Sequence, residues 1–346
     1  FARTLNYRVS NDNAFSTPLQ SVALSPITPL IDPRTGLKSG ALDPNRGTPN
    51  TNYPVYYNPL LNIGGADYNT FTNRMLGNVY GQAQIAKGLS FRTEFGVDML
   101  NQTEEAYYGP VTVRNSEYPR GGGFTTADQI INYTTNYFFR YNTNVKEIHN
   151  FDVVAGMSYQ DQNLFSQGAT GEAYPSTSYK KLVSTGTKSD ATSTETEFSF
   201  LSYFSRVNYK LMDKYLVALS GRFDASSRFS PNNRWGFFPA ASLGWIVSEE
   251  NFLKDSKWLS FLKLKTSYGL TGNAEIGNYP WQGLWTGDAH YGSIPGQRPS
   301  QLPNPDLKWE TTASFDIGLE FGIFNNRLSA EVDYYVRNTT DLLLAQ

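Results

Sequence analysis

The sequence predicts an all-β fold, a transmembrane antiparallel up-and-down β-barrel, of which its 346 residues supply about eleven strands. Three observations predict this fold. Apolar and polar residues alternate with a period of two along most of the chain, as in strands whose two faces meet different surroundings. Short and long connections follow one another strictly in turn. Several expected strands have twelve residues or more, whereas strands of soluble proteins usually have about five or six.

The residues from Leu89 to Met99 form the clearest strand. The odd-numbered positions are apolar apart from one threonine, and the even-numbered positions are polar or small: Ser90, Arg92, Glu94, Gly96 and Asp98. Faces this different indicate that one side meets apolar surroundings and the other meets water or polar groups.

The same alternation predicts the remaining strands and places aromatic residues near their ends. Tyr137, Trp235 and Trp245 are examples of these aromatic residues, and a membrane barrel needs them as its interfacial girdle. In chain order, with the clearest strand included, we expect strands at about 1–10, 74–86, 89–99, 131–143, 150–161, 197–210, 214–226, 235–247, 261–272, 307–322 and 327–340.

The connections predict the orientation of the barrel. In an up-and-down barrel every second connection lies on the same side, so all the long connections share one side; short periplasmic turns and long extracellular loops are typical of outer-membrane barrels. A soluble sandwich or solenoid would explain the alternation but not this ordering. We expect long extracellular loops at about 11–73, 100–130, 162–196, 226–234 and 272–306.

The composition excludes several other classes of protein. The chain has no cysteine, which excludes disulfide scaffolds, thiol catalysis and cysteine-ligated zinc or iron–sulfur sites. A net charge of −2 lacks the basic excess of a nucleic-acid-binding protein, so we expect no nucleic-acid partner. No apolar run is long enough for a transmembrane helix, but alternation hides membrane strands from that criterion.

No group of residues has the spacing of a catalytic or metal site. Adjacent carboxylates such as Glu104 and Glu105 point to opposite faces of a strand. The two histidines, His149 and His290, are far apart in the sequence. We therefore expect no catalytic residues, no metal site and no cofactor.

Four groups of motifs, in this order, resemble the SusC/RagA family of TonB-linked outer-membrane transporters, and the resemblance covers essentially the whole chain. The first is NAFSTPLQSVAL at 13–24, with PLID at 29–32 and NPL at 58–60. The others are YLVALSGRFDASSRF at 215–229 with RWGFFPAASLGW at 234–245, LKTSYGLTGN at 264–273, and NPDLKWETT at 304–312.

The resemblance implies that residues 1–346 are part of one TonB-dependent-receptor β-barrel domain, about half the wall of a 22-stranded barrel. Such proteins import oligosaccharides or peptides across the outer membrane of Gram-negative bacteria of the Bacteroidota type. They work beneath a SusD-like lipoprotein lid and take energy from the TonB complex through an N-terminal plug. Both ends of the chain look cut, so we expect an internal stretch of a longer protein that carries the plug and the remaining strands.

Two sets of residues are candidates for binding. Aromatic residues in the loop 272–306 could stack on a ligand or contact the lid, although they could also pack the loop on itself: Tyr279, Trp281, Trp285 and Tyr291. Charges on the polar strand faces mix both signs, as a lumen filled by water or by the plug requires. Those expected to face the lumen or plug are Arg92, Glu94, Asp98, Arg140, Arg222 and Asp224.

Nutrient import is one of two functions that the sequence leaves open. The alternative is a SusC-like barrel that serves as a structural or interaction subunit of a larger outer-membrane assembly. The lack of a catalytic group disfavours an enzyme, and the sequence does not fix the substrate.

Overall fold

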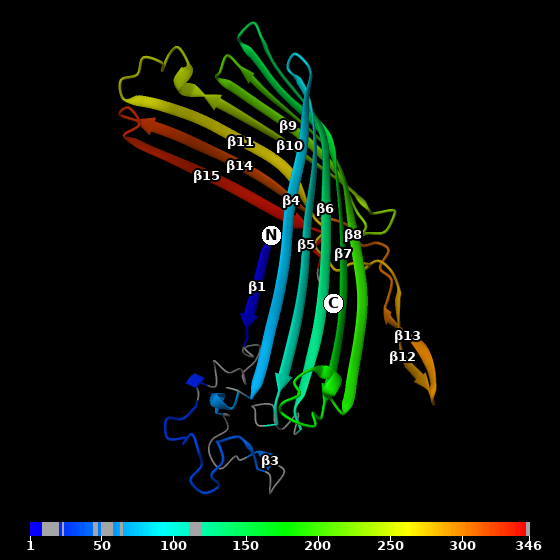
Figure 1. Cartoon of the computed structure of the whole chain (residues 1–346). Helices are drawn as coiled ribbons and strands as arrows, with labels where there is room; N and C mark the ends of the chain where they lie inside the picture. Colours follow the sequence, from blue (N-terminus) through cyan, green and yellow to red (C-terminus); the bar gives the residue numbers. More distant parts are fainter. Residues whose placement is uncertain are drawn as a thin grey trace. The chain divides into compact units, whose positions relative to one another are not determined.

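The computed structural model describes residues 1–8, 21–22, 24–43, 48–49, 58–62, 65–110 and 120–343. They form an all-β structure dominated by one eleven-stranded antiparallel sheet, as predicted. Figure 1 shows its strands, which pair in chain order. The sheet contains β1 (Ala2–Tyr7), β4 (Ala66–Ala86), β5 (Leu89–Tyr108), β6 (Gly122–Val145), β7 (His149–Glu172), β8 (Thr187–Leu211), β9 (Tyr215–Ser226), β10 (Trp235–Ile246), β11 (Leu259–Asn273), β14 (Glu310–Ile323) and β15 (Leu328–Thr340).

Two small hairpins and three single-turn helices complete the described structure. β2 (Leu42–Asp43) pairs with β3 (Thr48–Pro49), and β12 (Leu284–Tyr291) pairs with β13 (Ile294–Gln301). The 3-10 turns are η1 (Pro59–Leu61), η2 (Leu182–Ser184) and η3 (Val247–Glu249). No helix in these described ranges is long and apolar enough to cross a membrane.

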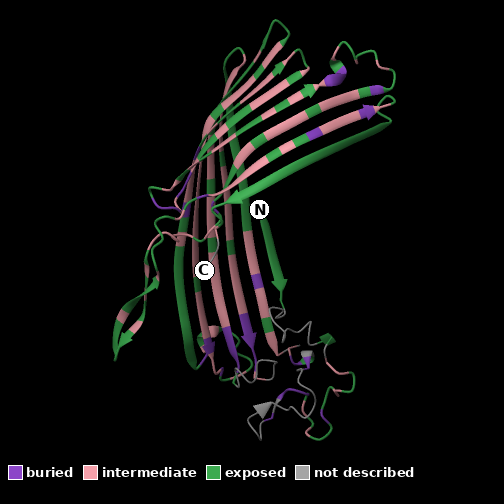
Figure 2. Cartoon of the chain, turned by 180° about the vertical axis from the view of Figure 1, so that it is seen from behind, coloured by how far each residue is buried: buried purple, intermediate pink, exposed green. Residues whose placement is uncertain are grey.

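Strand order agrees with an up-and-down barrel wall. β1 and β15 end the order of the large sheet, so the described residues make an open stretch of wall and not a closed barrel. β15 is exposed along its whole length, as Figure 2 shows. An exposed apolar edge strand of this length would aggregate in water, which favours further strands beside it in the complete protein.

Several expected loops are shorter than the sequence indicates. β5 and β6 run through most of 100–130, β7 and β8 run into both ends of 162–196, and β4 begins within 11–73. The loop 272–306 contains the β12–β13 hairpin, whereas 226–234 agrees closely with the link between β9 and β10. Parts of two loops, at 9–20, 23, 44–47, 50–57, 63–64 and 111–119, lie outside the described residues.

The chain divides into two compact units. Unit 1 comprises 1–76, 98–131 and 163–196, and unit 2 comprises 77–97, 132–162 and 197–346. In unit 1, β1 pairs with β4 from Ala2 opposite Arg74 to Tyr7 opposite Asn69. Polar side chains occupy both faces of its strands, since Gln129 donates to Asn101 on one face and Ser166 to Asp128 on the other.

One face of unit 2 carries a ladder of aromatic pairs between neighbouring strands, the aromatic ladder. Phe223 and Phe237 stack with ring centroids 4.3 Å apart, although each side chain remains about half exposed. Such pairs contribute roughly 0.5–1.5 kcal/mol beyond their buried area. The other pairs on neighbouring strands are Phe91–Phe139, Tyr133–Tyr159, Phe151–Tyr209 and Tyr215–Trp245, and Tyr203 of β8 stacks with Trp235 of β10 across β9.

The spacing of the ladder matches the apolar thickness of an outer membrane. Trp235 and Trp245 stand at opposite ends of β10. At a rise of about 3.3 Å per residue their separation along the strand is about 33 Å, and a tilt of about 35–45° reduces this to an apolar band of about 25 Å. A surface this apolar would be unfavourable in water, so we infer that lipid covers it.

A buried aromatic cluster, the loop-end cluster, packs against the opposite face of unit 2. Phe229 is fully buried beside Trp309 and Ala274, and Phe200 and Phe238 pack against them. The Phe238 ring lies directly over two glycines, Gly236 and Gly272, where a Cβ atom would collide with it.

The Gly272→Ala substitution is expected to lower barrel stability by about 1–3 kcal/mol, because overpacking displaces Phe238 from between Gly236 and Trp309. The measurement is the temperature at which the full-length protein loses its heat-modifiable electrophoretic mobility. Gly81→Ala is the matched control, since its nearest neighbour would be the Thr93 methyl at 3.6 Å. Equal temperatures for the two variants would contradict this packing argument.

Candidate functional site

The face opposite the aromatic ladder, the polar face, carries charges in pairs. Arg92 bonds Glu94 (Nε–Oε1 2.6 Å) on the same strand, and its guanidinium lies 4.1 Å from the Tyr80 ring centroid. Asn136 on β6 donates to the other Glu94 oxygen at 3.2 Å. Neither charge is left without a partner, so this face tolerates ionised groups that lipid would not.

The other four predicted charges also have partners within their own units. Arg222 bonds Asp224 (Nε–Oδ1 2.6 Å) and the buried Ser202 (2.8 Å). The structure therefore joins four of the six predicted residues in two direct pairs. It gives the other two residues partners that the sequence did not indicate: Asp98 pairs with Arg74 in unit 1, and Arg140 with Asp152 in unit 2.

A three-strand charge network lies at the β11, β14 and β15 end of the polar face. Lys265 contacts Glu331, Asp333 at 3.0 Å and Glu320 at 3.5 Å. Gly318 stands between Lys265 and Asp333 on the middle strand. A Cβ at that position would collide with both side chains, so the glycine leaves the space in which this lysine meets its carboxylates.

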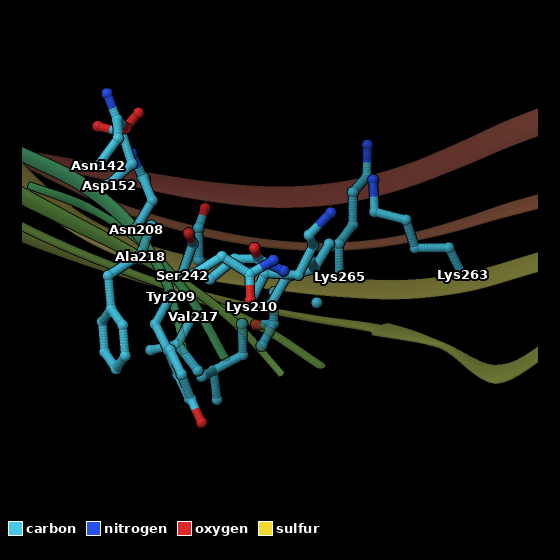
Figure 3. A pocket seen from close by; sticks show the side chains of 18 of the residues that line it. Asn142, Asp152, Asn208, Tyr209, Lys210, Val217, Ala218, Ser242, Lys263 and Lys265 are labelled. Carbon is cyan, nitrogen blue, oxygen red and sulfur yellow. The ribbon is translucent and has the colours of Figure 1, made fainter. Parts of the chain in front are cut away.

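The polar face is hollowed beside the short turns. Figure 3 shows this hollow, a cavity of about 820 Å³, with Asn142 and Asp152 on one side and Lys263 and Lys265 on the other. Small side chains, Ala218 among them, line its middle. The lining thus combines amide, ammonium and carboxylate groups with side chains that belong to the ladder face, such as Val217 and Leu243.

Three loops meet at the other end of the polar face and are tied together by hydrogen bonds. Ser230 and Asn233 donate to the Pro305 carbonyl at 2.7 and 3.1 Å. Trp309 Nε1 donates to the Arg234 carbonyl at 2.9 Å. Arg234, Pro305 and Trp309 belong to the sequence motifs at 234–245 and 304–312, so those motifs help to hold the loops over the wall.

Arg228 is the central residue of this junction, and sequence reasoning did not single it out. Its guanidinium donates to Asn278 Oδ1 (3.0 Å) and the Ala274 carbonyl (3.1 Å), and it lies 4.0 Å from the Phe198 ring centroid. Burial lowers the pKa of Arg228, with an opposing effect from Glu275. The only sequence signal that pointed to Arg228 was its place in the motif at 215–229.

Beside Arg228 lies the loop-end pocket, a cavity of about 310 Å³. It combines aromatic walls from Phe200 and Trp309 with charges of both signs from Arg222, Asp224, Arg228 and Glu275. This lining is more polar than that of most small-ligand sites, whose walls are predominantly apolar.

The structure separates the four predicted aromatic residues into two pairs. Tyr279 accepts a hydrogen bond from the Glu197 amide at 3.0 Å, and Trp281 Nε1 donates to the Ser227 carbonyl at 3.3 Å, so this pair packs at the loop base. Trp285 and Tyr291 lie on the β12–β13 hairpin and are 66% and 87% exposed. Only the second pair is free to contact a partner.

The hairpin has its own stabilising features. Gly292, with φ of 62°, supplies the left-handed conformation of its two-residue turn. Arg298 donates twice to Asp288, Nε–Oδ1 at 2.8 Å and Nη2–Oδ2 at 2.6 Å, which lowers the pKa of that carboxyl group. Figure 1 shows the hairpin projecting away from β11 and β14, and its strands pair only with each other among the described strands.

Comparison with known proteins identifies this wall. The family model described as "TonB dependent receptor-like, beta-barrel" matches residues 23–346. The TonB-dependent receptor SusC of Bacteroides thetaiotaomicron is 32% identical over 86% of this chain and 30% of its own length. A TonB-dependent receptor of Formosa agariphila is 35% identical over 76% of this chain and 26% of its own length.

Solved structures agree with these sequence relatives. The RagAB peptide transporter superposes with a TM-score of 0.78 at 32% identity, over 83% of this chain and 32% of that chain. The closed-closed state of the RagAB peptide importer gives 0.77 at 30% identity, over 88% and 33%. The chain thus spans about a third or less of the proteins it matches. It belongs to the SusC/RagA family of TonB-dependent receptors and forms part of their β-barrel domain in the Gram-negative outer membrane.

Proposed function

We propose that the complete protein imports oligosaccharides or peptides across the outer membrane, with TonB-derived energy and beneath a SusD-like lipoprotein lid. The observation that carries this proposal is the contrast between the two faces of unit 2. One face carries an aromatic ladder suited to contact with lipid. The opposite face carries paired charges suited to a water-filled lumen. The family consists of receptors and transporters, which supports transport and not catalysis.

The polar face is proposed to line the lumen, with its long loops outside the cell. Arg92, Glu94 and Arg140 lie well below the loops, where a plug inside the barrel would meet them. Their pairing within the wall keeps the charges neutralised when the plug moves, and exposed pairs of this kind contribute only about 0–1 kcal/mol each. Weak wall pairs could therefore exchange partners with a plug at little cost.

The loop-end pocket is proposed to contact the imported solute. Arg228 can meet a carboxylate and Glu275 an ammonium group, beside the partly buried Phe200 ring. The mixture of charges suits a peptide's two termini, and the aromatic and amide groups suit a glycan. This pocket therefore supports the substrate class without selecting one member of it.

The β12–β13 hairpin is proposed to contact the lid lipoprotein. Isolated two-stranded hairpins are marginally stable in water, and this one exposes Trp285, Tyr291 and Ile294. Pro295 and Pro299 remove backbone donors from β13, which opposes docking through that edge. Contact through the apolar side chains remains, and aromatic anchors dominate such interfaces.

Affinity purification of the full-length protein from detergent-solubilised outer membrane, followed by mass spectrometry, tests the lid proposal. We expect one SusD-like lipoprotein in equal stoichiometry. Combining Trp285→Ala with Tyr291→Ala should reduce its recovery at least tenfold, because each anchor is worth about 2 kcal/mol. The control combines Trp258→Ala with Phe252→Ala, two exposed aromatics of the β10–β11 turn.

A stable set of barrel-assembly or secretion components in place of the lipoprotein would instead favour the scaffold function. If the hairpin and turn variants lost the lipoprotein to the same extent, the hairpin would not be its specific contact. The proposal that a lipoprotein lid binds the protein would still stand. The two parts of the proposal are thus tested separately.

The pH dependence of the hairpin follows from the Asp288–Arg298 pair. Because folding lowers the pKa of Asp288, the pair's contribution is present above the unfolded value of about 3.9 and is lost as pH falls through the lower folded value. Hydrogen exchange of the 284–301 amides, corrected for intrinsic rates, should stay constant from pH 7 to 5 and accelerate below about pH 4.

Two substitutions make this pH prediction specific. Asp288→Asn should accelerate exchange at pH 7 and abolish the acid step, because the charged acceptor is gone. Asp306→Asn, in the segment after the hairpin, should leave both unchanged. If hydrogen exchange in Asp288→Asn still accelerated below about pH 4, a group other than Asp288 would cause the pH dependence.

A further inference from the structure

A groove on the aromatic-ladder face lies beside the short turns of unit 2. It crosses β9, β10, β11 and β14 and has a volume of about 490 Å³, within the range of about 300–1,000 Å³ of small-ligand sites. The outward-facing side chains that line it are Tyr215, Val217, Leu243, Trp245, Leu264, Thr266 and Ile317.

Strand register places the groove on the lipid side of the wall. Trp245 is opposite both Tyr215 and Leu264, and Leu243 is opposite Val217. The lining positions alternate with the polar-face residue Lys265, whose ammonium points to the other side of the sheet. The walls are consequently almost entirely apolar, with the Thr266 hydroxyl as the one polar side chain among the outward-facing residues that the structure describes in the lining.

The end of the groove nearest the turns is closed by polar groups in a fixed arrangement. Tyr215 and Trp245 stack at 6.5 Å and 16° and form its rim. Both aim their polar atoms at Glu250, with the Tyr215 hydroxyl at 2.7 Å and Trp245 Nε1 at 3.1 Å. Lys214 Nζ lies 3.4 Å from the same carboxylate, so an ammonium and a carboxylate stand together at the mouth.

The groove, its rim and its mouth match the three parts of a phospholipid. Amphipathic aromatics lie at headgroup level in membrane proteins, so the Tyr215–Trp245 rim marks the boundary between headgroup and acyl chain. The charges of Lys214 and Glu250 complement the phosphate and ammonium of a zwitterionic headgroup. The groove is continuous with the ladder that lipid already covers.

We propose that this groove holds an acyl chain of one zwitterionic phospholipid from the inner leaflet, with its headgroup against Lys214 and Glu250. The occupant is a phospholipid and not lipopolysaccharide because the groove opens at the short turns, which face the periplasm in the proposed orientation. The choice of leaflet therefore rests on the proposed orientation, whereas lipid binding in the groove does not depend on which solute the protein imports.

Native mass spectrometry of the delipidated full-length protein tests the proposal, with dioleoyl phosphatidylethanolamine in mixed micelles as the probe. We expect one bound lipid per protein. Val217→Trp fills the groove and should weaken binding at least tenfold. Leu219→Trp is the matched control, since Leu219 follows on the same strand and face, is 53% exposed, and lies outside the groove.

Three outcomes would overturn the proposal. The first is no retained phospholipid, or equal retention in both tryptophan variants. The second is preferential retention of purified lipopolysaccharide, which would reverse the leaflet. The third is a dimer mass that Val217→Trp abolishes, which would make the groove a contact between two copies. Unchanged heat-modifiable mobility in both variants would show that the barrel still folds.

Discussion

The constraint on which this structure depends is that a backbone group in lipid must find its hydrogen-bond partner inside the protein. The chain meets it by pairing each strand of the large sheet with its neighbours in sequence order. Tight turns preserve that pairing. Lys146 and Glu147, and Met212 and Asp213, adopt positive φ although none is glycine. Each such residue is strained by roughly 1–3 kcal/mol. The strained conformation persists because the hydrogen bonds between the two flanking strands hold the turn in place. The twist of such turns also matches that of the flanking strands.

Pairing fixes the backbone and leaves the two faces free to meet different solvents. On the ladder face, rings such as Phe223 and Phe237 gain dispersion energy from each other, although no protein covers their outer side. The polar face gains little stability from its ion pairs, and their arrangement matters more than their energy. On the polar face, glycines receive the ring of Phe238, which covers Gly236 and Gly272. These glycines are packing positions, and neither of them has positive φ.

The strands that separate lipid from water could be read from the sequence because their two faces differ. That signal ends where the outward face becomes polar. Beyond Met99 on β5 and Tyr159 on β7, both faces carry polar residues, so alternation vanishes while the strand continues to Tyr108 and to Glu172. The β12–β13 hairpin was missed for a different reason, since two prolines in β13 obscure its strand pattern. Its Gly292-Ser293 turn was the signal that could have found it. Partners of the predicted charges, such as Asp152 for Arg140, depend on register between strands, which alternation does not specify.

The loop end combines a fixed base with a projecting arm, and this division has a functional consequence. Arg228, Trp281 and Trp309 bind neighbouring loops through neutral carbonyl and amide acceptors, so the base does not depend on the ionisation of any carboxylate. The hairpin beyond it is held by its own ladder, by one exposed ion pair and, at its foot, by Gln301, which donates to the Tyr279 and Gln282 carbonyls at 2.9 and 2.7 Å. A partner that grips Trp285 and Tyr291 can therefore move the arm without opening the pocket beside Arg228. In the function proposed above, contact with a lid and contact with a solute are then separate binding events on one wall, and substitution is expected to weaken each without loss of the other.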